Sequence, residues 1–353
     1  MANKVTGRTD TSGALTTAPV TPKSLIIIDK VSGEQTADKE EKVIFSITGS
    51  KDAADAFGAN SLASKMVKIL ITNGVDNIKG IIVPSTGETA LADTLEATLV
   101  DKSIKVVLCC DNETTSISAV KDHLTMAEEN DMFRYSVFAP TEEDTKSQDK
   151  LIAFAKTVND DRIFIPSSAF LGNDGNVVEP QITATGLASA IMTETDDPAL
   201  PMNGVEIRGF SGVSRVMLET EMKALAEAGI TAFYTEGSSP IVYRLVTSDV
   251  DTSKIWQEGT TRFIADYVLE SNEALLRANY KRTKNVVRVL NAIKDDVKLN
   301  MEKIAAAEII ENWDEATLTV VQDPADKYGA LVDYEFDVVT PLYTITINQH
   351  MKL

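Results

Sequence analysis

Few residues of this 353-residue chain have the types and spacing that catalysis or metal binding requires. Its two histidines are His123, within a predicted helix, and His350, and neither belongs to an HExxH motif, a Cys/His cluster or a triad pattern. We interpret His123 as structural, since a histidine in a helix is far more often structural than catalytic. Cys109 and Cys110 are adjacent, and disulfide geometry disfavours a bridge between neighbours. The sequence therefore predicts no disulfide framework, as expected of a reducing compartment.

The loop at residues 84–88, Pro-Ser-Thr-Gly-Glu, lies between a predicted strand and a predicted helix. Proteins of the α/β class bind anions at helix N-termini in this position. The loop lacks both the GxGxxG spacing and the Walker Gly-Lys-Ser/Thr sequence, and Ser85 or Thr86 as a helix N-cap explains its residues without a ligand. A small-molecule-binding protein or enzyme with Ser85, Thr86 and Gly87 near its pocket stays open as the alternative function.

Two further patterns could have indicated chemistry. Residues 173–176, Asn-Asp-Gly-Asn, resemble a calcium-binding turn, but they have neither the EF-hand spacing nor its closing glutamate, and a plain turn is expected. Carboxylates are plentiful, yet no pair of them stands out in the sequence. We therefore predict a protein that is not an enzyme and that has no cofactor or metal ion.

Charge is distributed unevenly along the chain. The chain has 53 acidic and 34 basic residues, a net charge of −19, which argues against nucleic acid or an anionic membrane surface as a partner. Between residues 277 and 303, however, eight basic residues are interrupted by only three acidic ones. Arg277, Lys281, Lys284 and Arg288 have the spacing i, i+4, i+7 and i+11, which predicts one basic face on a helix. An acidic partner surface would offset their repulsion, and a solvated basic face is the alternative.

The elements that would position these residues begin at residue 24, where short apolar strands alternate with helical stretches. Strands are predicted at residues 25–28, 43–47, 80–83, 104–110, 135–138 and 162–165, with helices at 53–71, 88–100, 116–129 and 149–158. Strands that are apolar on both faces indicate a mostly parallel sheet covered by helices. Residues 24–200 are therefore predicted to form an α/β domain, doubly wound or three-layered.

A domain boundary is predicted near residues 196–201, Asp-Asp-Pro-Ala-Leu-Pro. Residues 201–340 have an α+β pattern, with strands late in the chain. The predicted elements are helix 219–228, strand 241–247, helices 257–269 and 272–303, and strands 317–321 and 334–339. The predicted fold class is thus α/β followed by a mixed C-terminal domain.

Both ends of the chain are predicted to be extended arms. Residues 1–23 are rich in Thr, Ser, Gly and Pro and cannot bury enough apolar surface to offset their ordering entropy. They have no apolar region of a secretory signal, and no apolar run in the chain reaches the roughly 18 residues of a membrane span, so we expect a soluble protein made in the cytoplasm. In residues 341–353, apolar and other residues alternate after Pro341, which predicts a terminal strand that pairs with a sheet edge of another copy. An edge strand within its own chain is the alternative.

The second half of the chain resembles the family of contractile tail sheath proteins, in motifs that follow the family's order. These motifs are Pro201-Met202-Asn203 with Gly209, Glu221 and Leu225 with Ala228-Gly229-Ile230, Arg244-x-x-Thr247-Ser248, Trp256, and Arg262 with Asp266-Tyr267-Val268. The resemblance covers roughly residue 201 to the C-terminus, and the first half supports it through architecture. The chain is short for the family and lacks room for the outer insertion domains of large phage sheaths. A simpler phage, a tailocin or a related injection system is therefore the expected setting.

The resemblance implies a subunit that forms hexameric rings stacked helically around a tail tube, with terminal extensions that add strands to neighbouring subunits. It implies contraction on a baseplate signal, which drives the tube through a target envelope. The implied partners are other copies, the tail tube protein, and baseplate and tail terminator proteins, in a virion or tail particle made in a host bacterial cytoplasm. A tube subunit is disfavoured, because tube subunits are small β-barrel-like folds. Strand exchange is predicted for Leu342, Tyr343, Ile345 and Ile347, and a tube-facing helix for Arg277, Lys281, Lys284 and Arg288.

Overall fold

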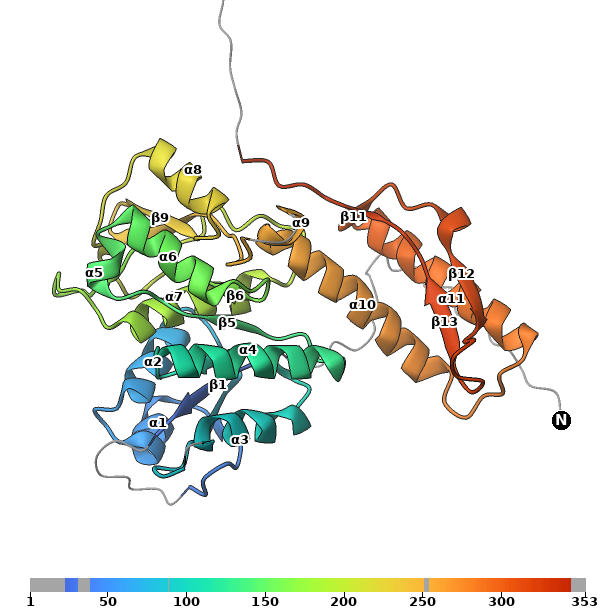
Figure 1. Ribbon diagram of the computed structural model, residues 1–353, viewed down its shortest axis with the longest axis horizontal. Coiled ribbons are helices and arrows are strands. Elements are labelled where there is room, and N and C mark those ends of the chain that lie inside the picture. The colour runs from blue at the N-terminus through green and yellow to red at the C-terminus, as the bar shows by residue number, and fades with distance from the viewer. Residues whose placement is uncertain (1–22, 31–38, 88, 251–253, 344–353) are drawn as a thin grey trace, which may run out of the picture. The chain divides into compact units, whose positions relative to one another are not determined.

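The chain divides into two compact units. The computed structural model describes residues 23–30, 39–87, 89–250 and 254–343. Among these, the larger unit takes in residues up to 267 together with 338–343, and the smaller unit takes in residues 268–337 (Figure 1). Among the helices of these described ranges, none combines the length and the apolar character needed to cross a bilayer.

A six-stranded sheet forms the centre of the larger unit, in the order β2-β3-β1-β4-β5-β6. The strands are β1 (Ser24–Asp29), β2 (Phe45–Ile47), β3 (Ile78–Ile82), β4 (Ile104–Cys109), β5 (Tyr135–Val137) and β6 (Ile163–Phe164). All pairs are parallel except the one between the edge strand β2 and β3. The parallel strands follow a doubly wound order, with β1 between β3 and β4. The predicted, mostly parallel α/β sheet is confirmed.

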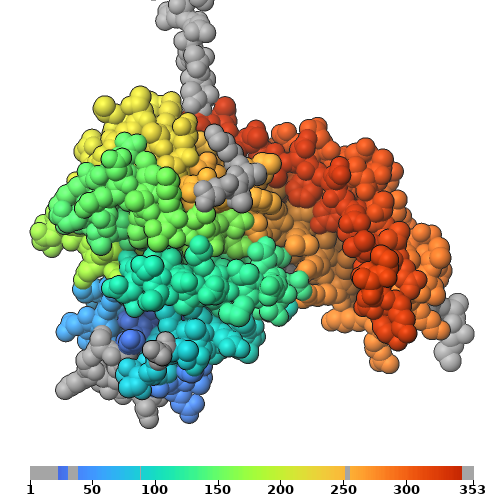
Figure 2. Space-filling view, viewed as in Figure 1, coloured from blue at the N-terminus to red at the C-terminus, as the bar shows by residue number. Residues whose placement is uncertain are grey.

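Helices cover both faces of this sheet, as the apolar strands require. On β1, Leu25 and Ile27 belong to one hydrophobic cluster, whereas Ile26 and Ile28 belong to a second cluster on the other face. The first cluster includes residues of α1 (Ser50–Phe57), α2 (Leu62–Thr72) and α7 (Pro180–Glu194). The second includes residues of α3 (Ala90–Ala97), α4 (Thr114–Glu129), α6 (Gln148–Val158) and α8 (Glu219–Glu227). Figure 2 shows side chains of α4, α6 and α8 forming a continuous surface over their side of the larger unit.

Helix α7 was not expected from the sequence. It is buried on nearly all sides, from Ile182 to Ile191, so its sequence lacks the amphipathic period that marks a surface helix. Small residues allow this close packing: a Cβ atom at Gly186 would lie 2.9 Å from the Phe170 ring and 3.0 Å from the Phe210 ring. The proline at the first position of the helix was the one local signal.

The predicted boundary between residues 200 and 201 falls inside the larger unit. Leu225 and Ile230 lie in the same hydrophobic cluster as Ile26 of the central strand. The remaining elements of this unit are short: α5 (Glu142–Thr145), the 3-10 helix η1 (Thr98–Val100), β7 (Phe170–Leu171) paired with β8 (Gly212–Val213), the hairpin of β9 (Ala232–Glu236) and β10 (Ser239–Arg244), and α9 (Lys254–Gln257).

Helix α10 (Gly259–Asn279) begins in the larger unit and continues into the smaller one. The smaller unit is built on this helix and the next. Its other elements are α11 (Val287–Ala306), β11 (Ile310–Glu311), the 3-10 helix η2 (Glu315–Thr317), β12 (Thr319–Gln322), β13 (Ala330–Asp333) and β14 (Asp337–Val338). Strands β12 and β13 form an antiparallel ribbon, and β11 pairs with β14. Buried Ile293, Val297, Met301 and Ile304 form the apolar face of α11.

The prediction of one helix over residues 272–303 is wrong, because the chain turns between α10 and α11 at residues 280–286. Arg282 has a φ of 61°, in the left-handed region, which a right-handed helix cannot contain. The hydroxyl of Thr283 donates to the carbonyl of Tyr280 at 2.9 Å and stabilises the turn. The helical spacing of the basic residues therefore predicted a helix where the chain turns. The sequence signals of the turn were Thr283 and Val286, β-branched residues with weak helix propensity.

Candidate functional site

The described residues of the predicted anion-binding loop lie at the surface. Ser85, Thr86 and Gly87 are exposed. Helix α3 begins at Ala90 with Thr89 in the N-cap position, so the predicted capping by Ser85 or Thr86 is wrong. An open cavity of about 540 Å³ lies elsewhere, lined by residues 44–46, Lys79 and residues 100–103.

His123 and Cys109 are buried in the core, whereas His350 lies outside the described residues. Arg134 Nη1 lies 2.9 Å from His123 Nε2, and burial together with this guanidinium lowers the pKa of His123 to about 3. The ring is therefore neutral. Burial raises the pKa of Cys109 to about 12, which keeps its thiol protonated. Within the described ranges, no three or more His, Cys, Asp or Glu side chains are placed to hold a metal ion.

The turn at residues 173–176 is stabilised by its own hydrogen bonds. The backbone N–H of Gly175 donates to the carbonyl of Gly172 at 2.8 Å. The carboxylate of Asp174 accepts from the backbone N–H of Asn176 at 3.0 Å and from its side-chain amide at 2.8 Å. This is the geometry of an Asx turn.

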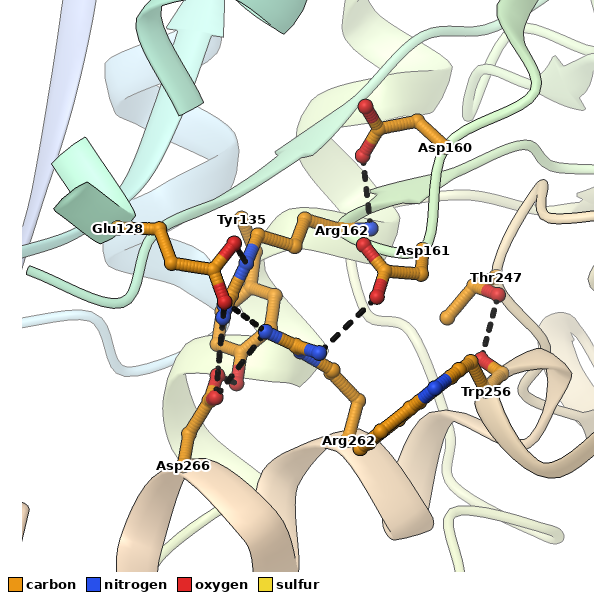
Figure 3. A network of polar contacts seen from close by, with 9 residues as sticks. All are labelled: Glu128, Tyr135, Asp160, Asp161, Arg162, Thr247, Trp256, Arg262 and Asp266. Atoms are coloured by element: carbon orange, nitrogen blue, oxygen red, sulfur yellow. Dashed lines mark hydrogen bonds and ion pairs between the residues drawn. The ribbon is translucent and has the colours of Figure 1, made fainter. Parts of the chain in front are cut away.

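A network of ion pairs around two buried arginines joins α4, the segment before β6, and the first turns of α10 (Figure 3). Arg162 lies at its centre, with 2% of its side chain exposed. Its guanidinium donates to Asp266 from Nη1 at 2.7 Å and from Nη2 at 3.1 Å. It also donates to Glu128 at 2.9 Å and 3.3 Å. Such bidentate pairs fix both distance and orientation, so Arg162 holds α10 against the edge of the sheet.

A second arginine, Arg262, extends the network along α10. It donates to Glu128 at 2.7 Å and to Asp161 at 3.0 Å, and it lies 3.5 Å from the carboxylate of Asp266. Its guanidinium lies over the ring of Trp256, 4.9 Å from the centroid. The same carboxylate of Asp266 accepts from the hydroxyl of Tyr135.

Burial is the main cause of the pKa shifts of the carboxyl groups in this network. Burial raises the pKa of Asp161 to about 6, against the opposing charge of Arg162, and Glu128 and Asp266 raise it further. Burial likewise raises the pKa of Asp160 to about 6. Burial alone would lower the pKa of Arg162, but the nearby groups Asp266, Tyr135 and Glu128 together outweigh burial and raise it. A buried network with these hydrogen bonds rigidifies the elements it joins, and its role here is to fix the start of α10.

Several of the motif residues that carry the sequence resemblance lie against one another in the larger unit. The hydroxyl of Thr247 donates to the carbonyl of Trp256 at 2.8 Å. Gly229 follows α8 with a φ of 77°, and a Cβ atom there would lie 3.1 Å from the carbonyl oxygen of Thr247. Asp266 and Arg262 lie in the ion-pair network beside Trp256. These motif residues therefore have packing roles in the structure.

Sequence reasoning missed the other half of the network. Glu128, Tyr135, Asp161 and Arg162 come from segments far from α10 in the chain, so no spacing pattern could connect them. The one available signal was the charged triplet at residues 160–162, which directly precedes a fully buried strand. Charged residues that directly precede a buried strand usually require charged or hydrogen-bonding partners within the fold.

The predicted tube-facing residues lie at one end of the smaller unit. Arg277 is in the last turn of α10, Lys281 and Lys284 are in the connection, and Arg288 is in the first turn of α11. We call residues 277–288 the hairpin tip. All four side chains are exposed, and the tip contains five basic residues and no acidic one.

The structure describes two of the four residues predicted for strand exchange. Leu342 is 68% exposed. The hydroxyl of Tyr343 donates to Glu258 Oε1, and the guanidinium of Arg244 lies 4.9 Å from the centroid of its ring. Ile345 and Ile347 lie outside the described residues.

Several solved structures of sheath proteins have the same fold as this chain. The sheath tail protein of Desulfitobacterium hafniense aligns with 96% of this chain and 100% of its own length, at a TM-score of 0.67 and 8% sequence identity. The helical sheath of the anti-feeding prophage in its contracted state aligns with 99% of this chain and 100% of its own, at a TM-score of 0.73 and 14% identity. The chain has the fold of contractile tail sheath proteins.

This sheath fold extends over the whole chain, including the first half, where the sequence had shown no motif. The contracted sheath complex of an extracellular contractile injection system, PVC, covers 100% of this chain at a TM-score of 0.68 and 10% identity. Chains of the anti-feeding prophage baseplate have the fold as well. No protein-family model matches the chain, and no curated protein matches it by sequence. The likeness predicted from the motifs is therefore confirmed as one of fold.

Proposed function

We propose that the chain is the structural subunit of a contractile tail sheath, which polymerises as stacked hexameric rings around a tail tube and contracts to drive the tube through a target envelope. The observation that carries this proposal is the alignment of the chain, from end to end, with a helical contracted sheath that it also covers completely. Its place would be a virion or tail particle assembled in a bacterial host. Its partners would be other copies, the tube protein, and baseplate and terminator proteins, without nucleic acid, membrane insertion or catalysis.

The larger unit supplies what a contracting lattice needs from its subunits, a body that does not deform. Its sheet is covered on both faces, and its ion pairs fix the first turns of α10, with Arg162 and Asp266 both buried. Contraction then becomes a change between two packings of rigid bodies.

The ribbon of β12 and β13 is the best candidate among the described elements to accept strands from other copies. Each strand pairs only with the other, so each has an outer edge without a strand partner within the described ranges. Val321 and Leu331 are 47% and 40% exposed on it. A two-stranded ribbon is marginal by itself, and strand addition from a neighbour would complete it through main-chain hydrogen bonds. Such links hold subunits together without fixing their orientation.

The hairpin tip is the proposed contact with the tube. Because the chain turns here, the basic residues do not share one helix face as the sequence predicted. The turn nevertheless gathers all five cations at one end of the α10–α11 pair. Cations repel one another at this density, and an acidic tube surface would offset that repulsion. The contact would be strongest at low salt.

The test of polymerisation is a truncation that removes residues 344–353 and keeps Tyr343 with its contacts. We expect a folded, monomeric protein with an unchanged melting temperature, whereas the full chain forms hollow cylinders under negative stain. Cylinders formed equally well by the truncated chain would contradict the role of the C-terminal strand.

The test of the tube contact reverses Lys281 and Lys284 to glutamate. We expect empty sheath to assemble normally and co-assembly with purified tubes to be lost at low salt. The matched control reverses Lys146 and Lys150, two exposed lysines of the larger unit, and should leave co-assembly intact. Equal loss in both variants would indicate a general charge effect and not a tube contact.

The alternative of a small-molecule site at residues 84–88 has no support in the structure. Ser85, Thr86 and Gly87 are exposed, and the open cavity of about 540 Å³ in the larger unit is lined by other residues.

A further inference from the structure

The last described residue of the chain, Tyr343, is attached to its own subunit. The chain leaves the larger unit within α10 and returns to it at Val338, the last residue of β14. Five residues later, the hydroxyl of Tyr343 donates to Glu258 Oε1, and Glu258 directly precedes the first residue of α10. One hydrogen bond thus joins the point where the chain enters α10 to the point where it departs toward its C-terminus.

The partner of Tyr343 is a buried and oriented ion pair. Glu258 is 9% exposed. Its other oxygen, Oε2, accepts from Arg244 Nη2 at 2.8 Å and from Arg244 Nε at 3.1 Å. The guanidinium of Arg244 also lies 4.9 Å from the ring centroid of Tyr343. The three side chains form a closed set, in which a charged acceptor takes the phenol and a cation covers the ring.

The neighbouring residue shows that this attachment is specific. Leu342, adjacent in the chain, is 68% exposed, although it is the more apolar side chain. Burial raises the pKa of Tyr343, and the carboxylate of Glu258 raises it further, so the phenol stays a neutral donor. The segment is therefore held by a directional polar contact and not by general apolar burial.

We propose that Tyr343 anchors the C-terminal segment to its own subunit, so that any strand passed to another copy begins only after it. The second part rests on the proposed sheath function. It revises the prediction for Tyr343, which the sequence pattern had grouped with Ile345 and Ile347 as part of the exchanged strand. A fixed departure point sets the direction and reach of the remaining ten residues, which matters where neighbouring subunits rotate but stay linked.

The experiment uses the full chain as a monomer in dilute solution, so that it tests the anchor independently of assembly. Chymotrypsin cleaves after tyrosine or phenylalanine, and the held ring of Tyr343 should protect that bond. Tyr343→Phe keeps the cleavable ring and loses the hydrogen bond, and Glu258→Gln loses the charged acceptor. A hydrogen bond to a charged group stabilises the attached state, so losing it increases the population of the detached state that the protease cleaves. We therefore expect cleavage after residue 343 to become about 10-fold faster in both variants.

Two controls separate the anchor from general loosening. Tyr328 is 81% exposed, so cleavage after it should be fast and equal in all variants. Tyr280→Phe removes another phenol–carboxylate hydrogen bond, the 2.8 Å contact with Asp296, and should leave cleavage after Tyr343 unchanged. Cleavage after Tyr343 that is already as fast as after Tyr328 in the wild type, or that neither variant accelerates, would overturn the anchor. If the anchor is confirmed and no polymer forms, only the sheath proposal fails.

Discussion

Replacing Asp266 by asparagine should lower the free energy of unfolding of the larger unit by about 3 kcal/mol, because it breaks a buried ion pair from one side. Asparagine keeps the shape of the side chain but removes the charge that faces Arg162 at 2.7 Å and 3.1 Å. Arg162 would retain only Glu128, whose side chain is 47% exposed and hence better screened. That remaining partner places the expected loss at the lower end of the range of about 3–5 kcal/mol for breaking buried pairs.

Urea unfolding monitored by tryptophan fluorescence measures this loss. Trp256 lies against Arg262 within the network, and Trp313 lies in the smaller unit. Trp313→Phe in every variant therefore restricts the signal to the larger unit. Lys146→Met, which removes an exposed lysine paired with Glu142 and Glu143, serves as the control and should not change the transition.

A double-mutant cycle decides whether the pair acts as a unit. Arg162→Met alone should cost about as much as Asp266→Asn, since each leaves a buried partner without its counter-charge. Together they should cost less than the sum by about 2 kcal/mol. Losses that add within about 0.5 kcal/mol, or an Asp266→Asn variant as stable as the wild type, would refute the account of this network.

Two further predictions concern the larger unit. Gly229→Ala should lower the free energy of unfolding in urea by about 3 kcal/mol, because its φ is 77° and a Cβ atom would lie 3.1 Å from the Thr247 carbonyl oxygen. Gly237→Ala is the control: its φ is 63° but the space around it is open, so the loss should be only about 1 kcal/mol. Equal losses in the two variants would contradict the packing argument. Asp161 has a folded pKa of about 6 against an ordinary 3.8, so the folded state binds its proton more tightly, and this carboxyl adds stability as the pH falls from 7 to 5. The wild type should therefore gain stability relative to Asp161→Asn over that range. His123, with a folded pKa of about 3, lowers the stability as the pH falls, but it does so equally in both proteins and cancels in the comparison. A stability difference that does not change with pH would contradict the burial of Asp161.

The sheet was predictable because its strands are buried on both faces. Residues 24–29 and 104–109 are almost continuously apolar, and the turns and helices between them have ordinary end signals. Burial on nearly all sides also explains why helix α7 was not predictable. A helix without a polar face has no helical period of hydrophobic residues in its sequence.

The candidate site was predictable only in part. Trp256, Arg262 and Asp266 were found through their resemblance to a family, but their partners are distant in sequence and meet them only in the folded chain. The basic spacing at residues 277–288 predicted a helix face, and a left-handed Arg282 turned it into a hairpin tip. The helical spacing of residues indicates which of them could share a helix face, but it does not indicate where the chain reverses direction.

Cryo-electron microscopy of the purified full-length protein decides whether copies of this chain polymerise by exchanging their terminal strands. We expect hollow helical cylinders in which Tyr343 stays against Glu258 of its own subunit and residues 344–353 extend a sheet of a neighbouring one. Compact particles without a helical lattice, or cylinders whose terminal strands return to their own subunit, would contradict it.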